Sequence, residues 1–188
     1  MRVIAGTLRS RQFKSVPGLA VRPTPDRLRE ALFNVLAPRI EGAVFIDAYA
    51  GSGAVGIEAV SRGASRVILI ERSPQALAII RENLRALAIE PLVTVVRGKA
   101  SALLPDYEAD IVFLDPPYDQ VKEYTDSMLA VSRTRCRLAI AQHASQLTLE
   151  PQYGSLHRTR VLRQGDNSLS FYRAADEHPS HSSPSDQS

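Results

Sequence analysis

The chain has 188 residues, of which 44% are hydrophobic and 23% charged, a composition that excludes wholesale disorder. A chain of this length can form one domain with a hydrophobic core, and it is too short for two domains that each have their own core. The single cysteine, Cys136, excludes an internal disulfide framework and suits a reducing cytoplasm. No tract reaches the roughly 18 apolar residues of a membrane span, and the first residues turn polar too soon for a signal peptide. We therefore expect a cytoplasmic protein.

Positive charge is concentrated at the N-terminus, although the net charge of the chain is only +3. Residues 1–40 carry eight basic and two acidic side chains, whereas residues 41–173 carry fifteen of each and residues 174–188 carry three acids. A basic segment of this kind favours a polyanion through phosphate contacts and counterion release. A solvated, arginine-rich surface without a binding role explains the basic charge of residues 1–40 equally well.

Residues 1–40 predict a basic arm followed by a helix. Short apolar pieces at 3–5 and 13–16 flank a polar stretch, which indicates a hairpin or paired arm. Thr24 is suited to cap a helix whose apolar residues recur at helical spacing from Leu28 onward. Pro38 is expected to end that helix.

Residues 41–173 alternate short apolar runs with amphipathic stretches and predict one domain. The expected strands are 44–46, 67–70, 92–96, 111–114 and 138–141, and the expected helices include 54–62 and 73–87. Short strands without alternation, separated by helices, indicate a parallel sheet covered on both faces. The predicted fold is therefore a doubly wound α/β domain.

Two last apolar runs, 156–162 and 168–172, flank a Gly-Asp-Asn turn and predict a terminal antiparallel hairpin. Residues 174–188 are polar and low in complexity, and we expect a disordered tail there.

Acidic residues follow three of the predicted strands, at Asp47, Glu71 and Asp115. Ligands of an open α/β sheet bind outside the carboxyl ends of its strands. Residues 51–56 read Gly-Ser-Gly-Ala-Val-Gly, a G-x-G-x-x-G pattern at a strand-to-helix turn. Glycines there let backbone amides approach a ligand, and Glu71 stands where an acid accepts ribose hydroxyls. The pattern predicts a nucleoside-bearing cofactor.

Asp47 discriminates between two cofactors for this loop. A loop that binds a pyrophosphate is expected to avoid a carboxylate close by, whereas S-adenosylmethionine has no phosphate and carries ammonium and sulfonium charges. The pattern therefore favours S-adenosylmethionine, with a nicotinamide or flavin dinucleotide as the alternative. A tight turn without a ligand is disfavoured because two acids and the glycines occur together.

The stretch Asp115-Pro116-Pro117-Tyr118 predicts a site for the exocyclic amine of a base. Such an amine is a poor nucleophile because its lone pair is delocalised into the ring. If the Asp115 carboxylate and the Pro116 carbonyl accept its two N–H groups, the nitrogen can pyramidalise toward a methyl group. Tyr118 can stack on the base, a contact worth about 1–3 kcal/mol. Guanine, adenine and cytosine amines all fit, and a strand-ending Asp-Pro turn is the alternative.

Taken together, these stretches resemble the bacterial 16S ribosomal RNA guanine-N2 methyltransferases. The resemblance covers residues 1 to about 173 and rests on residues 22–24, 26–34, 47–59, 61–64 and 115–118. It implies a Rossmann-like class I methyltransferase fold, S-adenosylmethionine as the cofactor and methyl transfer to guanine N2. It also implies 16S rRNA or a small-subunit particle as the partner, and a monomer without a metal or a membrane contact.

The resemblance implies three groups of site residues. The catalytic residues would be Asp115, Pro116, Pro117 and Tyr118. The cofactor-binding residues would be Thr24, Asp47, Tyr49, Gly51, Ser52, Gly53, Glu71, Arg72 and Ser101. The RNA-binding residues would be Arg2, Arg9, Arg11, Lys14 and Arg22.

The chain departs from the family pattern after the third predicted strand. The family often has an Asp or Asn there, where it can meet the adenine amine of the cofactor, but this chain has Lys99. Ser101 or a backbone group is expected to substitute. Tyr49 also replaces a frequent phenylalanine, a change expected to be mild.

Three other functions stay open at this point. A DNA adenine-N6 or cytosine-N4 methyltransferase would use the same motif, although no separate target-recognition region is visible. A dinucleotide oxidoreductase would keep the glycine loop but leave residues 115–118 unexplained. A non-catalytic RNA-binding protein would need only the basic arm.

Overall fold

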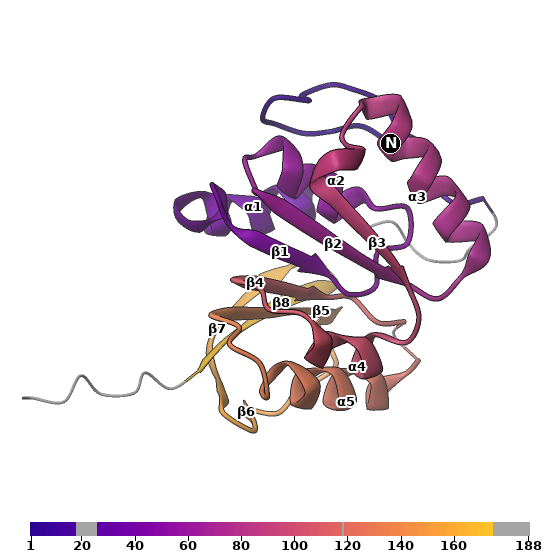
Figure 1. Cartoon of the computed structure of the whole chain (residues 1–188). Helices are drawn as coiled ribbons and strands as arrows, with labels where there is room; N and C mark the ends of the chain where they lie inside the picture. The colour runs from indigo at the N-terminus through magenta and orange to yellow at the C-terminus, as the bar shows by residue number, and fades with distance from the viewer. Residues whose placement is uncertain (18–25, 118, 175–188) are drawn as a thin grey trace, which may run out of the picture.

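The computed structural model describes residues 1–17, 26–117 and 119–174, and their strands form one sheet in the order β3-β2-β1-β4-β5-β8-β7-β6 (Figure 1). The parallel strands are β1 (Val44–Asp47), β2 (Arg66–Glu71), β3 (Val93–Arg97), β4 (Ile111–Leu114) and β5 (Leu138–Ala144). The antiparallel strands are β6 (Gln152–Tyr153), β7 (Leu156–Gln164) and β8 (Asn167–Ala174). The predicted doubly wound, mostly parallel α/β fold is confirmed.

Helices cover both faces of the sheet (Figure 1). One face carries α1 (Asp26–Ile40), α2 (Ala54–Ser61) and α3 (Pro74–Leu87), and the other carries α4 (Ala100–Leu103) and α5 (Val121–Val131). Short 3-10 turns follow α3 and α4, η1 (Glu90–Leu92) and η2 (Leu104–Asp106). Successive residues of β1 enter opposite cores, Phe45 with α1–α3 and Ile46 with α5. Two covered faces are the reason that the parallel strands read as unbroken apolar runs.

The helix boundaries confirm one sequence prediction and correct another. Ser73 caps α3 as predicted, because its side chain accepts a hydrogen bond from the backbone N–H of Ala76 at 3.3 Å. Pro38 does not end α1, which runs on to Ile40. A proline in the last turn removes only one backbone hydrogen bond, and the burial of Ile40 holds that turn against the core. The predicted cap Thr24 lies outside the described residues.

The predicted C-terminal hairpin is confirmed, and it also extends the main sheet. β8 pairs with β5, so that Phe171 lies opposite Ile140, and β7 then pairs with β8. β8 is buried along most of its length, whereas most of β7 is exposed. Of the predicted tail, Ala174 ends β8 and the rest lies outside the described residues.

The N-terminal arm is paired, as predicted, and it is packed on the domain. An isolated antiparallel bridge joins Arg2 to Gln12, and the N–H of Val3 donates to the carbonyl of Arg11 at 2.9 Å. The side chains of Val3 and Phe13 are buried in the core shared with α1–α3. Residues on both sides of position 40 share this core. The division of the chain into a basic segment, 1–40, and a domain, 41–173, therefore stays a prediction that rests on the distribution of charge.

Candidate active site

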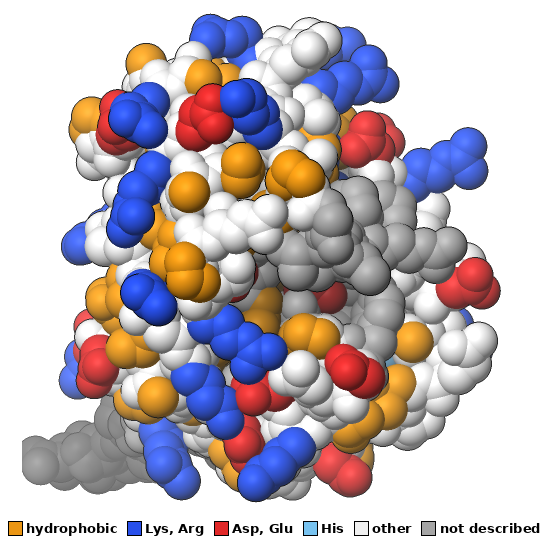
Figure 2. All heavy atoms as spheres, turned by 90° about the vertical axis from the view of Figure 1, so that its right-hand side faces the viewer, with side chains coloured by type: hydrophobic (Ala, Val, Ile, Leu, Met, Phe, Trp, Pro, Cys, Tyr) orange, Lys and Arg blue, Asp and Glu red, His pale blue; other side chains and the backbone are white. Residues whose placement is uncertain are grey.

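Three acidic residues converge at the carboxyl edge of the sheet, where the strand order reverses between β1 and β4. Asp47 ends β1, Glu71 ends the neighbouring β2, and Asp115 directly follows β4 on the other side. Such a switch point is where open α/β sheets bind ligands. Viewed from the right-hand side of Figure 1, the molecular surface is hollowed near its middle, with acidic side chains visible there and basic ones above and below (Figure 2).

The glycine loop between β1 and α2 leaves its backbone open to a ligand. Gly51 and Gly53 have φ of +55° and +83°, in the left-handed region that favours glycine. A Cβ on Gly51 would meet no atom within 4 Å, so a ligand can approach the chain there. A Cβ on Gly56 would lie 2.3 Å from Leu69 Cδ2, so this glycine lets α2 pack closely on β2. Ser52 is half-buried in the same loop.

Glu71 ties the glycine loop to the end of β2. One carboxylate oxygen accepts the Gly51 N–H at 2.9 Å, and the other accepts the N–H groups of Arg72 and Ser73, both at 2.8 Å. A carboxylate has about four acceptor positions, so one stays open for a hydroxyl group. Glu71 is half-buried, which leaves this acceptor within reach of a ribose in the hollow.

Asp47 is a buried acid whose charge no cation in the described structure balances. The residue is 2% exposed, and its carboxylate accepts the backbone N–H of Gly56 at 3.2 Å and is also stabilised by the backbone N–H of Tyr49. Burial raises the pKa of Asp47 to about 7, helped by the nearby charge of Glu71 and opposed by the Gly56 N–H. None of the ion pairs among the described residues includes Asp47. A positively charged ligand group in the hollow would be stabilised by this acid, which fits the ammonium and sulfonium groups of S-adenosylmethionine.

Tyr49 directs its hydroxyl toward α5. The hydroxyl donates to Glu123 Oε2 at 2.9 Å and lies 2.7 Å from Ser127 Oγ. Burial raises the pKa of Tyr49 above its ordinary value. A phenylalanine could not make these bonds, so the change from the family pattern adds a tie between the glycine loop and α5. Contact of Tyr49 with the cofactor stays a prediction.

Two further loops at the same edge also reach the start of α5. Lys99, exposed at the end of the β3 loop, places Nζ 3.3 Å from Glu123 Oε1 and 3.7 Å from Asp126 Oδ2. The guanidinium of Arg72 donates to Gln120 Oε1 at 3.4 Å. Ser101 is half-buried in α4, and its contact with the adenine stays a prediction. Three loops thus contact Gln120 and the polar residues of α5.

Helix α5 and its polar residues are the part of the site that the sequence pattern does not predict. Gln120 caps α5 without a side-chain hydrogen bond, so residues 121–131 lack a clear helix start. The helix forms because Tyr124 and Met128, one turn apart, are both buried. The weak signal that could have revealed it is this helical spacing of apolar residues.

The Asp115-Pro116-Pro117 turn is held rigidly at the end of β4. Tyr124 donates its hydroxyl to the Gln142 carbonyl at 2.9 Å and lies 3.4 Å from the carbonyl oxygen of Pro116. The Pro117 carbonyl accepts the Gln120 N–H at 2.9 Å. Pro116 is buried and Asp115 half-buried, whereas Tyr118 lies outside the described residues. A carbonyl has two lone pairs, so Pro116 keeps an acceptor position for a substrate amine.

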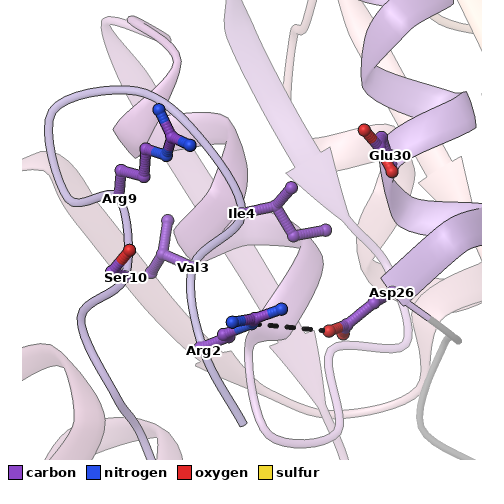
Figure 3. Close-up of a pocket in the computed structure, with 7 residues that line it drawn as sticks. All are labelled: Arg2, Val3, Ile4, Arg9, Ser10, Asp26 and Glu30. Atoms are coloured by element: carbon purple, nitrogen blue, oxygen red, sulfur yellow. Dashed lines mark ion pairs between the residues drawn. The ribbon is translucent and has the colours of Figure 1, made fainter.

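Most predicted RNA-binding side chains of the arm already have a partner in the protein. Arg2 and Arg9 line a hollow of about 180 Å³ together with Asp26 and Glu30 (Figure 3). Arg2 Nε lies 4.0 Å from Asp26 Oδ2, a long and exposed pair that is worth little. Arg9 has no ion pair within the described residues.

The other arm cations contact α3. Arg11 donates to the Ala86 carbonyl at 3.1 Å, and the ammonium of Lys14 pairs with Glu82. Arg22 lies outside the described residues.

A buried acid holds the arm in place. Glu58 is 1% exposed and accepts the N–H groups of Ile4 and Ala5 at 2.8 and 3.0 Å. Its carboxylate also pairs with Arg62 at 2.8 Å and with Arg29 at 3.8 Å. The contacts of Glu58 with the arm and with Arg29 could not be read from the sequence, because they join residues more than 25 positions apart, whereas the pair with Arg62 has the i,i+4 spacing of a helix.

The sheet order, the open glycine loop and the acids after β1 and β2 define a class I, S-adenosylmethionine-dependent methyltransferase. The residues of the site fit that cofactor, since Gly51 leaves open space, Glu71 keeps an acceptor and Asp47 lacks a cation.

Comparison with known proteins gives the family. The profile described as Conserved hypothetical protein 95 matches residues 1–173, and the chain belongs to this family. Ribosomal RNA small subunit methyltransferase D of Escherichia coli K12 is 36% identical over 171 residues, which cover 87% of this chain and 86% of that protein. YlbH of Bacillus subtilis 168, named provisionally as an rRNA methyltransferase, is 32% identical over 183 residues, 92% of this chain and 98% of that one.

Solved structures show the same fold. The Escherichia coli protein yhhF, described provisionally as a methyltransferase, has a TM-score of 0.77 and 32% identity, covering 93% of this chain and 97% of that chain. A hypothetical protein of Thermus thermophilus has a TM-score of 0.76 and 30% identity, with coverage of 91% and 98%.

Neither a membrane span nor a metal cluster is found in the described part of the chain. No helix there is long and apolar enough to cross a membrane. Within residues 1–17, 26–117 and 119–174, no cluster of His, Cys, Asp and Glu side chains is arranged to hold a metal ion.

Proposed function

We propose that the protein transfers a methyl group from S-adenosylmethionine to the exocyclic N2 of a guanine in 16S rRNA, acting in the cytoplasm on the small ribosomal subunit or its RNA. The observation that carries the proposal is the position of Asp115 and Pro116, beside the cofactor loop at the switch point of the sheet. Relatives named as small-subunit rRNA methyltransferases, similar along most of the chain, support the substrate class.

The cofactor supplies an electrophilic methyl group on a sulfonium centre. In this proposal the backbone of Gly51 and Gly53 lines its pocket, Glu71 accepts its ribose hydroxyls, and Asp47 faces its positive charge. The fixed positions of these groups follow from the hydrogen bonds of Glu71 and Asp47 to the glycine loop and α2. Thr24 and Ser52 are proposed to complete the pocket, as the family resemblance implies.

The substrate amine is oriented by two acceptors. The Asp115 carboxylate and the Pro116 carbonyl take its two N–H groups, which directs the nitrogen lone pair toward the methyl group. The amine loses one proton on methylation, and Asp115 is the acid placed to receive it. Tyr118 is proposed to stack on the base, which must first leave any helical stack. The choice of guanine over adenine or cytosine rests on the family resemblance.

The proposal is tested by supplying the purified protein with labelled methyl donor and three substrates: small-subunit RNA, small-subunit particles and duplex DNA. We expect label in the RNA or the particles, recovered as N2-methylguanosine by mass spectrometry, and none in the DNA. Label in DNA alone would favour a DNA amine methyltransferase, and N6-methyladenosine in the RNA would show that the base is wrong. Binding of NAD without binding of S-adenosylmethionine, measured by calorimetry, would instead favour an oxidoreductase.

Asp115→Ala tests the proposed catalytic residue. We expect transfer to fall by about 100-fold or more while cofactor affinity changes less than about twofold, because in this proposal Asp115 binds the acceptor amine and not the cofactor. The matched control is Asp119→Ala, which removes an exposed acid four positions away. Equal activity of the two variants would remove Asp115 from the mechanism.

The RNA role of the arm is tested with Arg9→Ala combined with Arg11→Ala. Loss of two phosphate contacts should weaken RNA binding and lower the slope of log K against log salt by about 0.7–0.9 per contact. An unchanged salt slope would leave the arm without a role in RNA binding.

A further inference from the structure

A groove runs between α1 and the C-terminal hairpin, away from the glycine loop. It has a volume of about 610 Å³ and is lined by α1, the start of β5, β7 and β8. The groove exists because the hairpin extends the sheet sideways: β8 is still buried, but most of β7 is exposed. None of the residues discussed above as catalytic, cofactor-binding or RNA-binding lines it.

Three arginines from three elements line this groove. Arg39 lies in the last turn of α1, Arg160 in β7 and Arg173 near the end of β8. No Asp or Glu is found among the described residues that line the groove, and none of the three arginines takes part in an ion pair within the described structure. Their charges therefore stay available to an anion.

The floor of the groove is apolar and partly buried. Leu138 and Phe171 belong to the core beneath α1, and Leu162 packs against it. The guanidinium carbon of Arg160 lies 6.0 Å from the centre of the Phe171 ring, so a cation stands over this floor. Asn34 and Thr159 add neutral hydrogen-bonding groups at its walls. This arrangement fits a nucleic-acid backbone, because the arginines can bind its phosphates while the apolar floor contacts its sugars.

The hollow under the arm provides a contrast. There Arg2 and Arg9 share the lining with Asp26 and Glu30, so the local charge is mixed (Figure 3). In the groove the charge is of one sign. The groove should therefore attract a polyanion more strongly than the hollow under the arm does.

We propose that the groove between α1 and the β7–β8 hairpin is a second contact surface for the RNA substrate, in which Arg39, Arg160 and Arg173 bind backbone phosphates. The inference rests on the proposed function, because the RNA it names is the methylated substrate. The arm and the groove both contact α1, through Arg29 on the arm side and Arg39 on the other. Phosphate contacts position a substrate without reading its sequence, so the groove serves affinity and orientation.

The experiment compares two double variants, each of which removes two exposed arginines. Arg160→Ala with Arg173→Ala alters the groove, and Arg66→Ala with Arg81→Ala alters exposed positions on β2 and α3. For the groove variant we expect RNA affinity to fall by about tenfold and the salt slope to decrease by about 1.4–1.8, with cofactor affinity unchanged. The control variant should lose much less of both. Arg160→Lys with Arg173→Lys should restore most of the affinity, because the charges return.

Two results would overturn the groove assignment without touching the proposed methylation. One is a groove variant that binds RNA with the affinity and salt slope of its control while wild-type protein still methylates the RNA. The other is a groove variant whose loss of RNA affinity disappears when the chain is shortened to end at Ala174. The groove arginines would then act on the acids of residues 175–188 and not on RNA. Failure of the proposed function itself would appear separately, as unmethylated RNA with the wild-type protein.

Discussion

Two buried acids, Asp47 at the end of β1 and Glu58 within α2, have different surroundings, which indicate a ligand role for one and a structural role for the other. Glu58, 1% exposed in the middle of α2, is balanced by Arg29 and Arg62 and accepts two N–H groups of the arm. Asp47, 2% exposed just before the glycine loop, is stabilised by backbone N–H groups but is in no ion pair in the described structure. Burying an unbalanced charge costs free energy that packing alone does not require. This difference supports the proposal that Asp47 faces the positive charge of the cofactor.

Removal of the balanced acid should have the largest effect. Glu58→Ala leaves the buried Arg29 paired only with the exposed Asp26, takes the ion-pair partner of Arg62 away and releases the backbone of Ile4 and Ala5. We expect the free energy of unfolding, measured by urea denaturation, to fall by about 3–5 kcal/mol. Glu82→Ala breaks an exposed pair with Lys14 and should cost less than about 1 kcal/mol. Similar losses for both would show that Glu58 is not a structural anchor.

Removal of the unbalanced acid should act on the ligand instead. Asp47→Asn keeps an acceptor for the Gly56 N–H but loses the charge, so we expect affinity for S-adenosylmethionine to drop by about 10- to 100-fold. The unliganded protein should be at least as stable as wild type at a pH of about 8, where the wild-type acid is ionised. Calorimetric titration and thermal unfolding measure the two effects. Tight cofactor binding by Asp47→Asn would contradict the proposed role of the acid.

The pH dependence of stability sharpens the same comparison. The pKa of Asp47 is raised from 3.8 to about 7 on folding. Between these two pH values the folded protein holds a proton on Asp47 that the unfolded chain has lost. This contribution to stability is complete below a pH of about 4 and is lost as pH rises through about 7, at up to about 1.4 kcal/mol per pH unit. The stability of wild type relative to Asp47→Asn should therefore decline across that range. A difference independent of pH there would mean that Asp47 is already ionised in the unliganded fold.

The smallest effect is expected for Tyr49→Phe. This change removes the bonds to Glu123 and Ser127 and should cost about 1 kcal/mol of stability. A roughly twofold rise in KM for the cofactor would follow if the tie to α5 positions the glycine loop. Tyr107→Phe is the control, since the Tyr107 hydroxyl has no hydrogen bond among the described residues. A loss no larger than that of the control would show that the tie contributes nothing.

The acids of the site were more predictable than the residues that support them. Asp47, Glu71 and Asp115 were placed at one edge because each follows a continuous apolar run, and the structure puts them on three adjacent strands. The contacts of the surrounding loops with α5 could not be foreseen, because Lys99 and Glu123 meet only after the β3 loop and α5 have packed together. The same holds for Pro38, whose expected effect on α1 was overruled by the burial of Ile40.

Arginine pairs were the least predictable feature. Charge counts along the chain place the basic surface in residues 1–40 and show no excess in residues 41–173. The fold then uses Arg29 internally, engages Arg11 and Lys14 with α3, and brings Arg39 next to Arg160 and Arg173. Net charge along a chain says little about a surface, because pairing in three dimensions decides which charges stay available.

Local sequence is enough to predict the parallel strands, which follow from apolar runs, and the turn at Gly51 and Gly53, which follows from the conformational freedom of glycine. It also shows which acids stand at the strand ends. The tertiary structure alone decided which acids are balanced. Glu58 in α2 pairs with two arginines, whereas Asp47 at the end of β1 pairs with none within the described residues. The reason is that the burial of both acids and the approach of Arg29 to Glu58 depend on residues distant in sequence, which only the packed chain brings together.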